Sequence, residues 1–244
     1  MKIPQHDQTA IALARAVRNG DLVTIGNLLA AEPTLARARF VGCTGGTKTL
    51  LHLVADWPGY FPNAPQAVEL LLRAGANPDS RATDRDGRES ETPLHWAASS
   101  DDLEVAAALI DGGADIEAPG GSIAGGTPLT NAVGYGCWHV AHLLVGRGAR
   151  VASLWEAAAL GDRARVDELL ESEPAPTDTD LNDAFWQACH GGQRRMAEYL
   201  LGRGADINAI PGYSKQTPLQ VAGGIDTRHQ ALVDWLRQRG ALEG

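Results

Sequence analysis

The stretch Thr92-Pro93-Leu94-His95-Trp96-Ala97-Ala98 decides the fold of this chain. Thr92 can cap a helix whose first residue is a proline, and a missing backbone N–H costs nothing at that position. Leu94, Ala97 and Ala98 lie at positions i, i+3 and i+4, which form one buried face of a helix. The stretch therefore predicts a turn that leads into a short, one-sided helix.

The same pattern recurs along the chain at Thr49-Leu50-Leu51-His52, Thr127-Pro128-Leu129-Thr130 and Thr217-Pro218-Leu219-Gln220. A second apolar segment follows each opening, and several units then end in Gly-Ala, where glycine supplies the left-handed turn that stops a helix. The Thr-Pro-Leu-His sequence at 92–95 matches the helix opening of the ankyrin repeat. The whole chain accordingly resembles ankyrin-repeat proteins, less clearly in its first and fifth units.

This resemblance implies an all-α fold, an ankyrin-repeat α-solenoid of about seven helix-turn-helix units with short hairpin fingers. We expect one continuous array over residues 1–244, because the link 149–153 is too short for a flexible domain linker. The same link leaves no room for a finger between the fourth and fifth repeats. The predicted repeats are 9–42, 47–80, 90–118, 125–150, 151–178, 181–212 and 215–244.

The composition limits the function. The net charge of −9 disfavours binding to nucleic acid, and no apolar stretch is long enough to cross a membrane. The three cysteines have no metal-ligand spacing, so we expect no metal. We also expect no cofactor. We expect a cytoplasmic protein. Lys2, Lys48 and Lys215 are the only lysines, and this bias toward arginine suggests a GC-rich, bacterial genome.

A helical wheel indicates which residues form a binding surface. We call the leucine of each helix opening, such as Leu94, the anchor leucine and count positions from it. Positions +2, +5 and +6 lie opposite the second helix, and in ankyrin proteins that side lines a concave groove. Position +2 is polar in three successive repeats, and aromatic walls with a few converging polar groups are typical of a binding site. The candidate residues on this face are Asp56, Trp57, Trp96, Ser99, Asn131, Tyr135, Glu156, Gln187 and His190.

An insertion over 56–65 separates the two helices of the second repeat. Its three prolines and one glycine predict a structured loop rather than a longer helix. Tyr60 and Phe61 either form a recognition tip or fold over the loop itself. Since changes in surface loops cost little closure entropy, we expect that removing 58–63 leaves the fold largely intact.

Residues at the helix openings have structural explanations. His52 and His95 are expected to hydrogen-bond between adjacent repeats. Trp155 and Trp186 stand at the equivalent position and are expected to replace that bond by packing.

Three interpretations of the predicted groove remain open. The first is a protein-interaction module that binds a protein partner and is itself a monomer. The second is a small-molecule binder or enzyme, with Glu156 as general acid or base and His190 as a second proton carrier. Asn131 and Gln187 would then hold a polar group of the ligand. The third is a solvated helix face without a ligand. The absence of phosphate-loop, metalloprotease and nucleophile-elbow motifs gives the enzyme no further support.

Overall fold

The structure is a computed structural model that describes residues 1–224 and 229–243. The chain forms two compact units, Met1–Ala149 and Arg150–Gly244. Their boundary falls in the short link that the sequence singles out, and the chain passes from α8 to α9 without a strand. The last predicted repeat, 215–244, includes residues 225–228 and 244, which lie outside the described residues.

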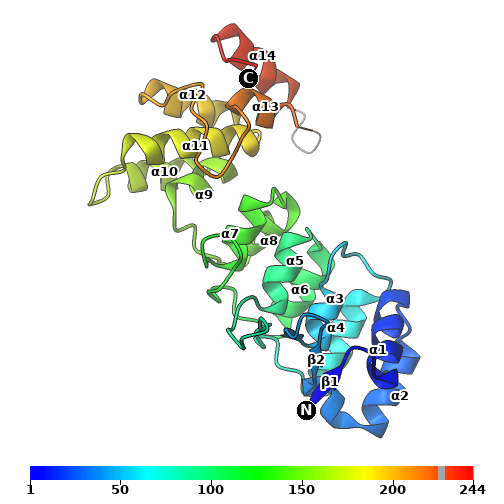
Figure 1. Ribbon diagram of the computed structural model, residues 1–244. Helices are drawn as coiled ribbons and strands as arrows, with labels where there is room; N and C mark the ends of the chain where they lie inside the picture. The colour runs from blue at the N-terminus through cyan, green and yellow to red at the C-terminus, as the bar shows by residue number, and fades with distance from the viewer. Residues whose placement is uncertain (225–228, 244) are drawn as a thin grey trace. The chain divides into compact units, whose positions relative to one another are not determined.

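Pairs of helices follow one another in the first unit (Figure 1). The first helices α1, α3, α5 and α7 pack on one another in succession, and so do the second helices α2, α4, α6 and α8. This arrangement confirms the predicted helix-turn-helix units. The elements are β1 (Lys2–Pro4), α1 (Gln8–Asn19), α2 (Leu22–Ala31), the 3-10 helix η1 (Pro33–Arg37), β2 (Arg39–Val41), β3 (Thr47–Lys48), α3 (Leu50–Val54), α4 (Ala64–Arg73), α5 (Pro93–Ser99), α6 (Leu103–Asp111), α7 (Pro128–Gly134) and α8 (Trp138–Gly146).

The helix openings are closed by reciprocal caps. At α5 the backbone N–H of Thr92 donates to Nδ1 of His95 at 3.2 Å, while Nε2 of His95 bonds to the carbonyl of Gly126 at 3.2 Å. His52 makes the same pair of contacts at α3, to Thr49 and to the carbonyl of Glu91. The predicted structural role of both histidines is therefore confirmed, since each connects its own helix to the backbone of the next repeat.

A small sheet stands beside α1 and α3. Strands β2 and β3 form an antiparallel hairpin, and Thr47 continues the pairing to Thr83 of the next finger. Strand β1 lies parallel to β2, with Ile3 opposite Phe40. The fingers were expected from the family resemblance, but the N-terminal strand was not, because three residues are too few to show an alternating pattern.

The second unit contains α9 (Leu154–Leu160), α10 (Arg163–Leu170), α11 (Asp178–His190), α12 (Arg194–Gly202), α13 (Pro218–Ala222) and α14 (Gln230–Gln238). Helices α9, α11 and α13 pack in succession. Helix α11 begins at Asp178 behind a Thr177 cap, earlier than the predicted repeat start at 181. A Cβ atom on Gly191 would lie 2.1 Å from the carbonyl oxygen of Ala159, so the close approach of α9 and α11 requires glycine.

Trp186 replaces the structural histidine differently from the prediction. Its indole N–H donates a 2.8 Å hydrogen bond to the carbonyl of Gln216. The prediction of packing alone was therefore incomplete, because tryptophan here makes the same kind of bond to the next repeat as His52 and His95. The aromatic ring of Trp186 also contacts His190 and Tyr213.

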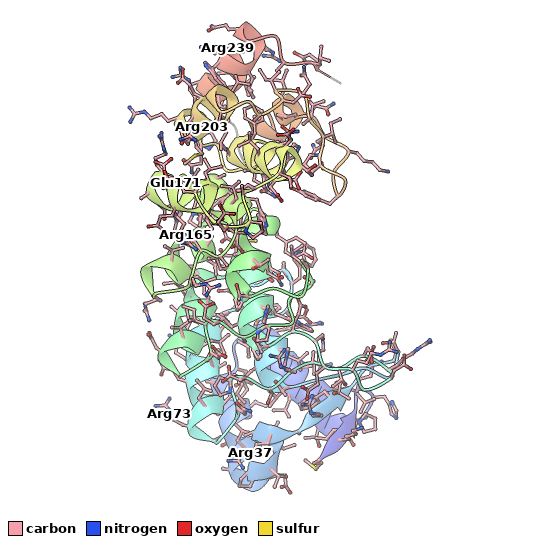
Figure 2. All side chains as sticks on the ribbon, turned by 90° about the vertical axis from the view of Figure 1, so that its left-hand side faces the viewer. Arg37, Arg73, Arg165, Glu171, Arg203 and Arg239 are labelled. Carbon is pink, nitrogen blue, oxygen red and sulfur yellow. The ribbon has the colours of Figure 1, made fainter. Side chains whose placement is uncertain are left out.

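Charged side chains cover the outer side of the second helices. Arg73 of α4 projects into solvent beside Glu69, and Arg203 follows the end of α12 (Figure 2). The anchor leucines on the inner side, such as Leu94 and Leu129, are fully buried. Among the residues that the structure describes, no helix is both long and apolar enough to cross a membrane.

Candidate functional site

The aromatic cleft lies on the first-helix side of the first unit and has a volume of about 260 Å³. It spans three successive repeats, since its residues come from the segment after α3, from α5, from the finger before α7 and from the end of α7. The residues that line it are Asp56, Trp57, Glu91, Trp96, Ser99, Ser100, Ser122 and Tyr135.

The packing of Trp96 fixes the middle of the cleft. Its ring and the buried His52 imidazole pack in a T-shaped arrangement, with ring centroids 5.0 Å apart. The ammonium group of Lys48 lies 5.2 Å from the Trp96 ring centroid, a cation–π distance. Because His52 is itself bonded at both ring nitrogens, the wall formed by Trp96 is held in a defined position.

The other two aromatic walls face solvent. The exposed fraction is 78% for Trp57 and 52% for Tyr135. The Tyr135 hydroxyl lies 3.1 Å from that of Ser122, which ties its ring to the finger before α7. Large exposed aromatic side chains next to polar groups are typical of interaction sites. Burying their apolar surface against a partner contributes favourably to the free energy of binding.

A polar network forms the floor of the cleft. Asn131 is fully buried, and its amide donates to Glu91 at 2.7 Å and to the Ser99 hydroxyl at 3.1 Å. The Glu91 carboxylate also accepts the backbone N–H of Ser122 at 2.9 Å. The Asp56 carboxylate at the other edge pairs with Lys48 at 2.9 Å. The cleft thus offers carboxylate and hydroxyl groups between aromatic walls.

Five of the predicted site residues line this cleft: Asp56, Trp57, Trp96, Ser99 and Tyr135. Asn131 lies beneath them as a buried support rather than on the wall. The helical wheel missed Glu91 and Ser122, because both precede the helices that it considers. A sequence signal does exist for Glu91, since it stands directly before the capping Thr92 of the deciding stretch.

Tyr60 and Phe61 line a different hollow, beside Asp102 and Glu104. The backbone N–H of Tyr60 donates to the Asp102 carboxylate at 2.6 Å, and its hydroxyl donates to the carbonyl of Asp101. The insertion is therefore bonded to the next repeat. Of the two alternatives left open by the sequence, these bonds favour a packed loop over a free recognition tip.

The remaining predicted residues belong to the second unit. One carboxylate oxygen of Glu156 accepts the backbone N–H groups of Ala152 and Ser153, both at 3.0 Å. These bonds form a capping box at the start of α9, and the Glu156 side chain is buried. This use of the carboxylate is structural and supplies no positive argument for a general acid or base.

Gln187 and His190 form a separate polar group on α11. Nδ1 of His190 lies 3.2 Å from the Gln187 side-chain oxygen, and the Gln187 amide donates to the Tyr213 hydroxyl at 3.3 Å. The Trp186 ring contacts both His190 and Tyr213. The two predicted residues thus lie together, and the finger residue Tyr213 joins them.

Comparison with known proteins places the chain in a family. The family described as ankyrin repeats (3 copies) matches residues 51–153, and the single ankyrin repeat matches residues 180–210. Together these matches cover more than half of the sequence. The chain belongs to the ankyrin-repeat family. Ankyrin repeats are generally protein-interaction modules.

One curated relative is the human Ankyrin repeat and KH domain-containing protein 1. It is 37% identical over 91 residues, which is 37% of this chain but 3% of that protein. The chain therefore spans only a small part of this relative.

Two solved structures share the fold. The ankyrin repeat domain of human ASB11 is 19% identical with a TM-score of 0.52, covering 91% of this chain and 96% of that one. The ankyrin repeat domain of Bcl-3, described as a unique member of the IkappaB protein family, is 27% identical with a TM-score of 0.52. Here the match covers 93% of this chain and 97% of that one.

Proposed function

We propose that this protein is an interaction module that binds a protein partner through the first-helix side of its first unit. The observation that carries the proposal is the aromatic cleft, in which Trp57 and Tyr135 stand largely exposed beside the fixed ring of Trp96. Tryptophan and tyrosine are the residues that most often dominate the free energy of protein–protein binding. Family membership supports the same conclusion.

The shape of the cleft favours a protein over a small molecule. Its volume of about 260 Å³ lies below the range of roughly 300–1,000 Å³ usual for pockets that enclose a small ligand. Three repeats contribute to it, and its two exposed walls leave it broad and shallow. A surface of this kind suits an extended segment or a helix of a partner better than an enclosed substrate.

Site-specific photo-crosslinking tests this proposal. A photoreactive phenylalanine analogue is placed at Trp57, at Tyr135, or at Val23 as a control, and the full chain is irradiated in cells of its source. Val23 is 72% exposed and lies on the second helix α2, outside the cleft. We expect the same crosslinked protein from positions 57 and 135 and none from position 23.

A second variant makes the result specific. Trp57→Ala, combined with the photoreactive residue at position 135, should lose the crosslinked product, because the opposite wall of the cleft is removed. Identical products from positions 23 and 57, or no product from either cleft position, would overturn the proposal.

A further inference from the structure

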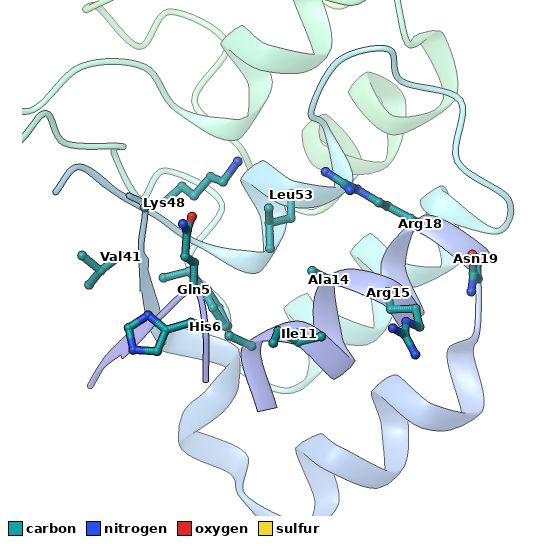
Figure 3. A pocket seen from close by; sticks show the side chains of 13 residues that line it. Gln5, His6, Ile11, Ala14, Arg15, Arg18, Asn19, Val41, Lys48 and Leu53 are labelled. Carbon is teal, nitrogen blue, oxygen red and sulfur yellow. The ribbon is translucent and has the colours of Figure 1, made fainter. Parts of the chain in front are cut away.

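A larger pocket of about 610 Å³ lies beside the aromatic cleft, between α1 and α3 of the same unit. Its apolar lining comes from Ile11 of α1, Leu53 of α3 and Val41 of β2 (Figure 3). Ile11 is 39% exposed although it is a large aliphatic residue. The pocket therefore offers an apolar surface that can accept a hydrophobic side chain.

The charged groups of this pocket are all basic. Arg15, Arg18 and Lys48 line it, whereas no carboxylate does. Arg18 and Lys48 extend toward Leu53 from opposite sides of the pocket (Figure 3). The whole chain has a net charge of −9, so a lining without acidic residues departs from its general composition.

The two arginines have no charge partner in the unit. Arg15 and Arg18 are exposed, and within the part of the chain that the structure describes neither forms an ion pair. They stand at positions +2 and +5 of the first helix, on the side where the wheel places the groove. Guanidinium groups are strong, often bidentate donors to carboxylates.

Lys48 connects the pocket to the aromatic cleft. Its side chain lines the pocket, while its ammonium group pairs with Asp56 and lies over Trp96, both of which line the cleft. A single segment of a partner can therefore contact both depressions. The volume of the pocket alone lies within the range of small-ligand pockets. Its exposed Ile11 and arginines and its continuity with the cleft nevertheless make it part of the surface proposed above.

We propose that this pocket receives an acidic segment of the protein partner, in which an aliphatic or aromatic side chain is flanked by Asp or Glu. The hydrophobic side chain lies against Ile11 and Leu53, and the carboxylates pair with Arg15 and Arg18. Complementary charge steers the segment into position, and the aromatic cleft binds its continuation. This inference rests on the proposed function, because it names the chemistry of the partner.

Selection from a library of random peptides displayed on phage tests the inference. The full chain, the double variant Arg15→Glu/Arg18→Glu and a control variant are each used as bait. The control is Arg194→Glu/Arg195→Glu, which makes the same charge change on two exposed residues of α12 in the second unit. We expect wild type and control to enrich peptides with Asp or Glu beside an apolar residue.

Affinity measurements then separate charge from folding. The peptide most enriched on wild type is synthesised, along with a version in which Gln replaces Glu and Asn replaces Asp. Arg15→Glu/Arg18→Glu and its neutral counterpart Arg15→Gln/Arg18→Gln should each bind the acidic peptide more weakly, by roughly tenfold for the reversal. High salt should reduce the difference in affinity for the acidic peptide between wild type and the α1 variants. Circular dichroism confirms that each variant is folded.

Other outcomes overturn the inference. Enriched peptides without acidic residues would exclude the proposed segment, and equal binding by the α12 control and the α1 variant would exclude the pocket. Tighter binding of a phosphorylated peptide than of the Glu peptide would show that the pocket prefers a phosphate group to a carboxylate. In each case the crosslinks from positions 57 and 135 still decide the proposed function separately.

Discussion

The side-chain amide of Asn131 lies 2.7 Å from the carboxylate of Glu91, and this bond links α7 to the residue that precedes the cap of α5. Asn131 is fully buried. Its side-chain oxygen also accepts the backbone N–H of Ile123 at 3.2 Å. The floor of the aromatic cleft therefore depends on a buried amide whose donors and acceptor are all occupied.

The first prediction concerns Glu91→Ala. This change removes the acceptor used by Asn131 and by the backbone of Ser122, and it should lower the free energy of unfolding by about 1–3 kcal/mol. Chemical denaturation of the purified chain measures the loss. Glu91→Gln is the control, because its side-chain oxygen can still accept both bonds and the loss should be much smaller. Equal losses would show that charge, rather than hydrogen bonding, matters at this position.

The second prediction concerns the protonation of His52. Its Nδ1 accepts the backbone N–H of Thr49, and its Nε2 therefore carries the hydrogen that reaches the Glu91 carbonyl. A second proton would have to enter at Nδ1 and break the bond that the Thr49 backbone N–H donates there. Burial lowers the pKa of His52 from 6.5 to about 4, with the Glu91 carbonyl bond acting in the opposite direction.

This shift makes stability depend on pH. Between about pH 6.5 and pH 4 the unfolded chain binds a proton at position 52 and the folded chain does not, so stability falls as the pH falls. The loss from this group is on the order of 3 kcal/mol and stops below about pH 4, where both states are protonated. The free energy of unfolding, plotted against pH across this range, should therefore have a steeper slope for wild type than for His52→Gln. The same slope in both proteins would contradict a lowered pKa of His52 in the folded chain.

Glutamine is a suitable replacement because the chain already uses it. Gln220 closes the cap of α13 with Thr217, in the position that His52 holds relative to Thr49. His52→Gln thus keeps the local cap while removing the titratable group. The pKa of His95 is also lowered by burial, so the difference between wild type and the variant, rather than either slope alone, reports His52.

The sequence predicted the helix pairs and much of the cleft because both follow from local periodicity. The spacing of Leu94, Ala97 and Ala98 defines the buried face of α5, and simple rotation then places Trp96 and Ser99 on the opposite side. The same rule identified Tyr135 at the end of α7. No tertiary information was needed, since every repeat presents the same face to its neighbours.

Contacts between distant residues could not be predicted in this way. Glu91 enters the site through a bond to Asn131 that no helical period describes, and β1 pairs with β2 across the whole first helix pair. Glu156 shows the opposite limitation. The helical wheel placed Glu156 on the groove side, because it considers only the direction of each side chain. It ignores the backbone N–H groups at the start of the helix. The Glu156 carboxylate accepts hydrogen bonds from two of these groups.

The third prediction concerns the insertion over 56–65, whose contacts in the structure point to a larger effect of its removal than loop closure entropy alone. The amide of Asn63 donates to the carbonyl of Gly20 at 2.9 Å, and the backbone of Tyr60 donates to the buried Asp102. A Cβ atom on Gly20 would lie 2.2 Å from the carbonyl oxygen of Pro62, so the loop is packed closely against the first repeat. The insertion thus connects the first three repeats instead of lying free on the surface.

Deleting 58–63 should therefore lower the free energy of unfolding by roughly 2–5 kcal/mol, since two neutral hydrogen bonds and one to a buried carboxylate are lost together. The matched variant Asn63→Gly removes only the amide bond to Gly20. Glycine accepts the positive φ of 55° at this position without strain. The free energy of unfolding of Asn63→Gly should therefore be lower than that of wild type by only about 1 kcal/mol. Chemical denaturation of the two variants and wild type gives both values. If the deletion is as stable as wild type, the loop contributes nothing to the fold and the interpretation of Tyr60 and Phe61 as a free recognition tip is restored.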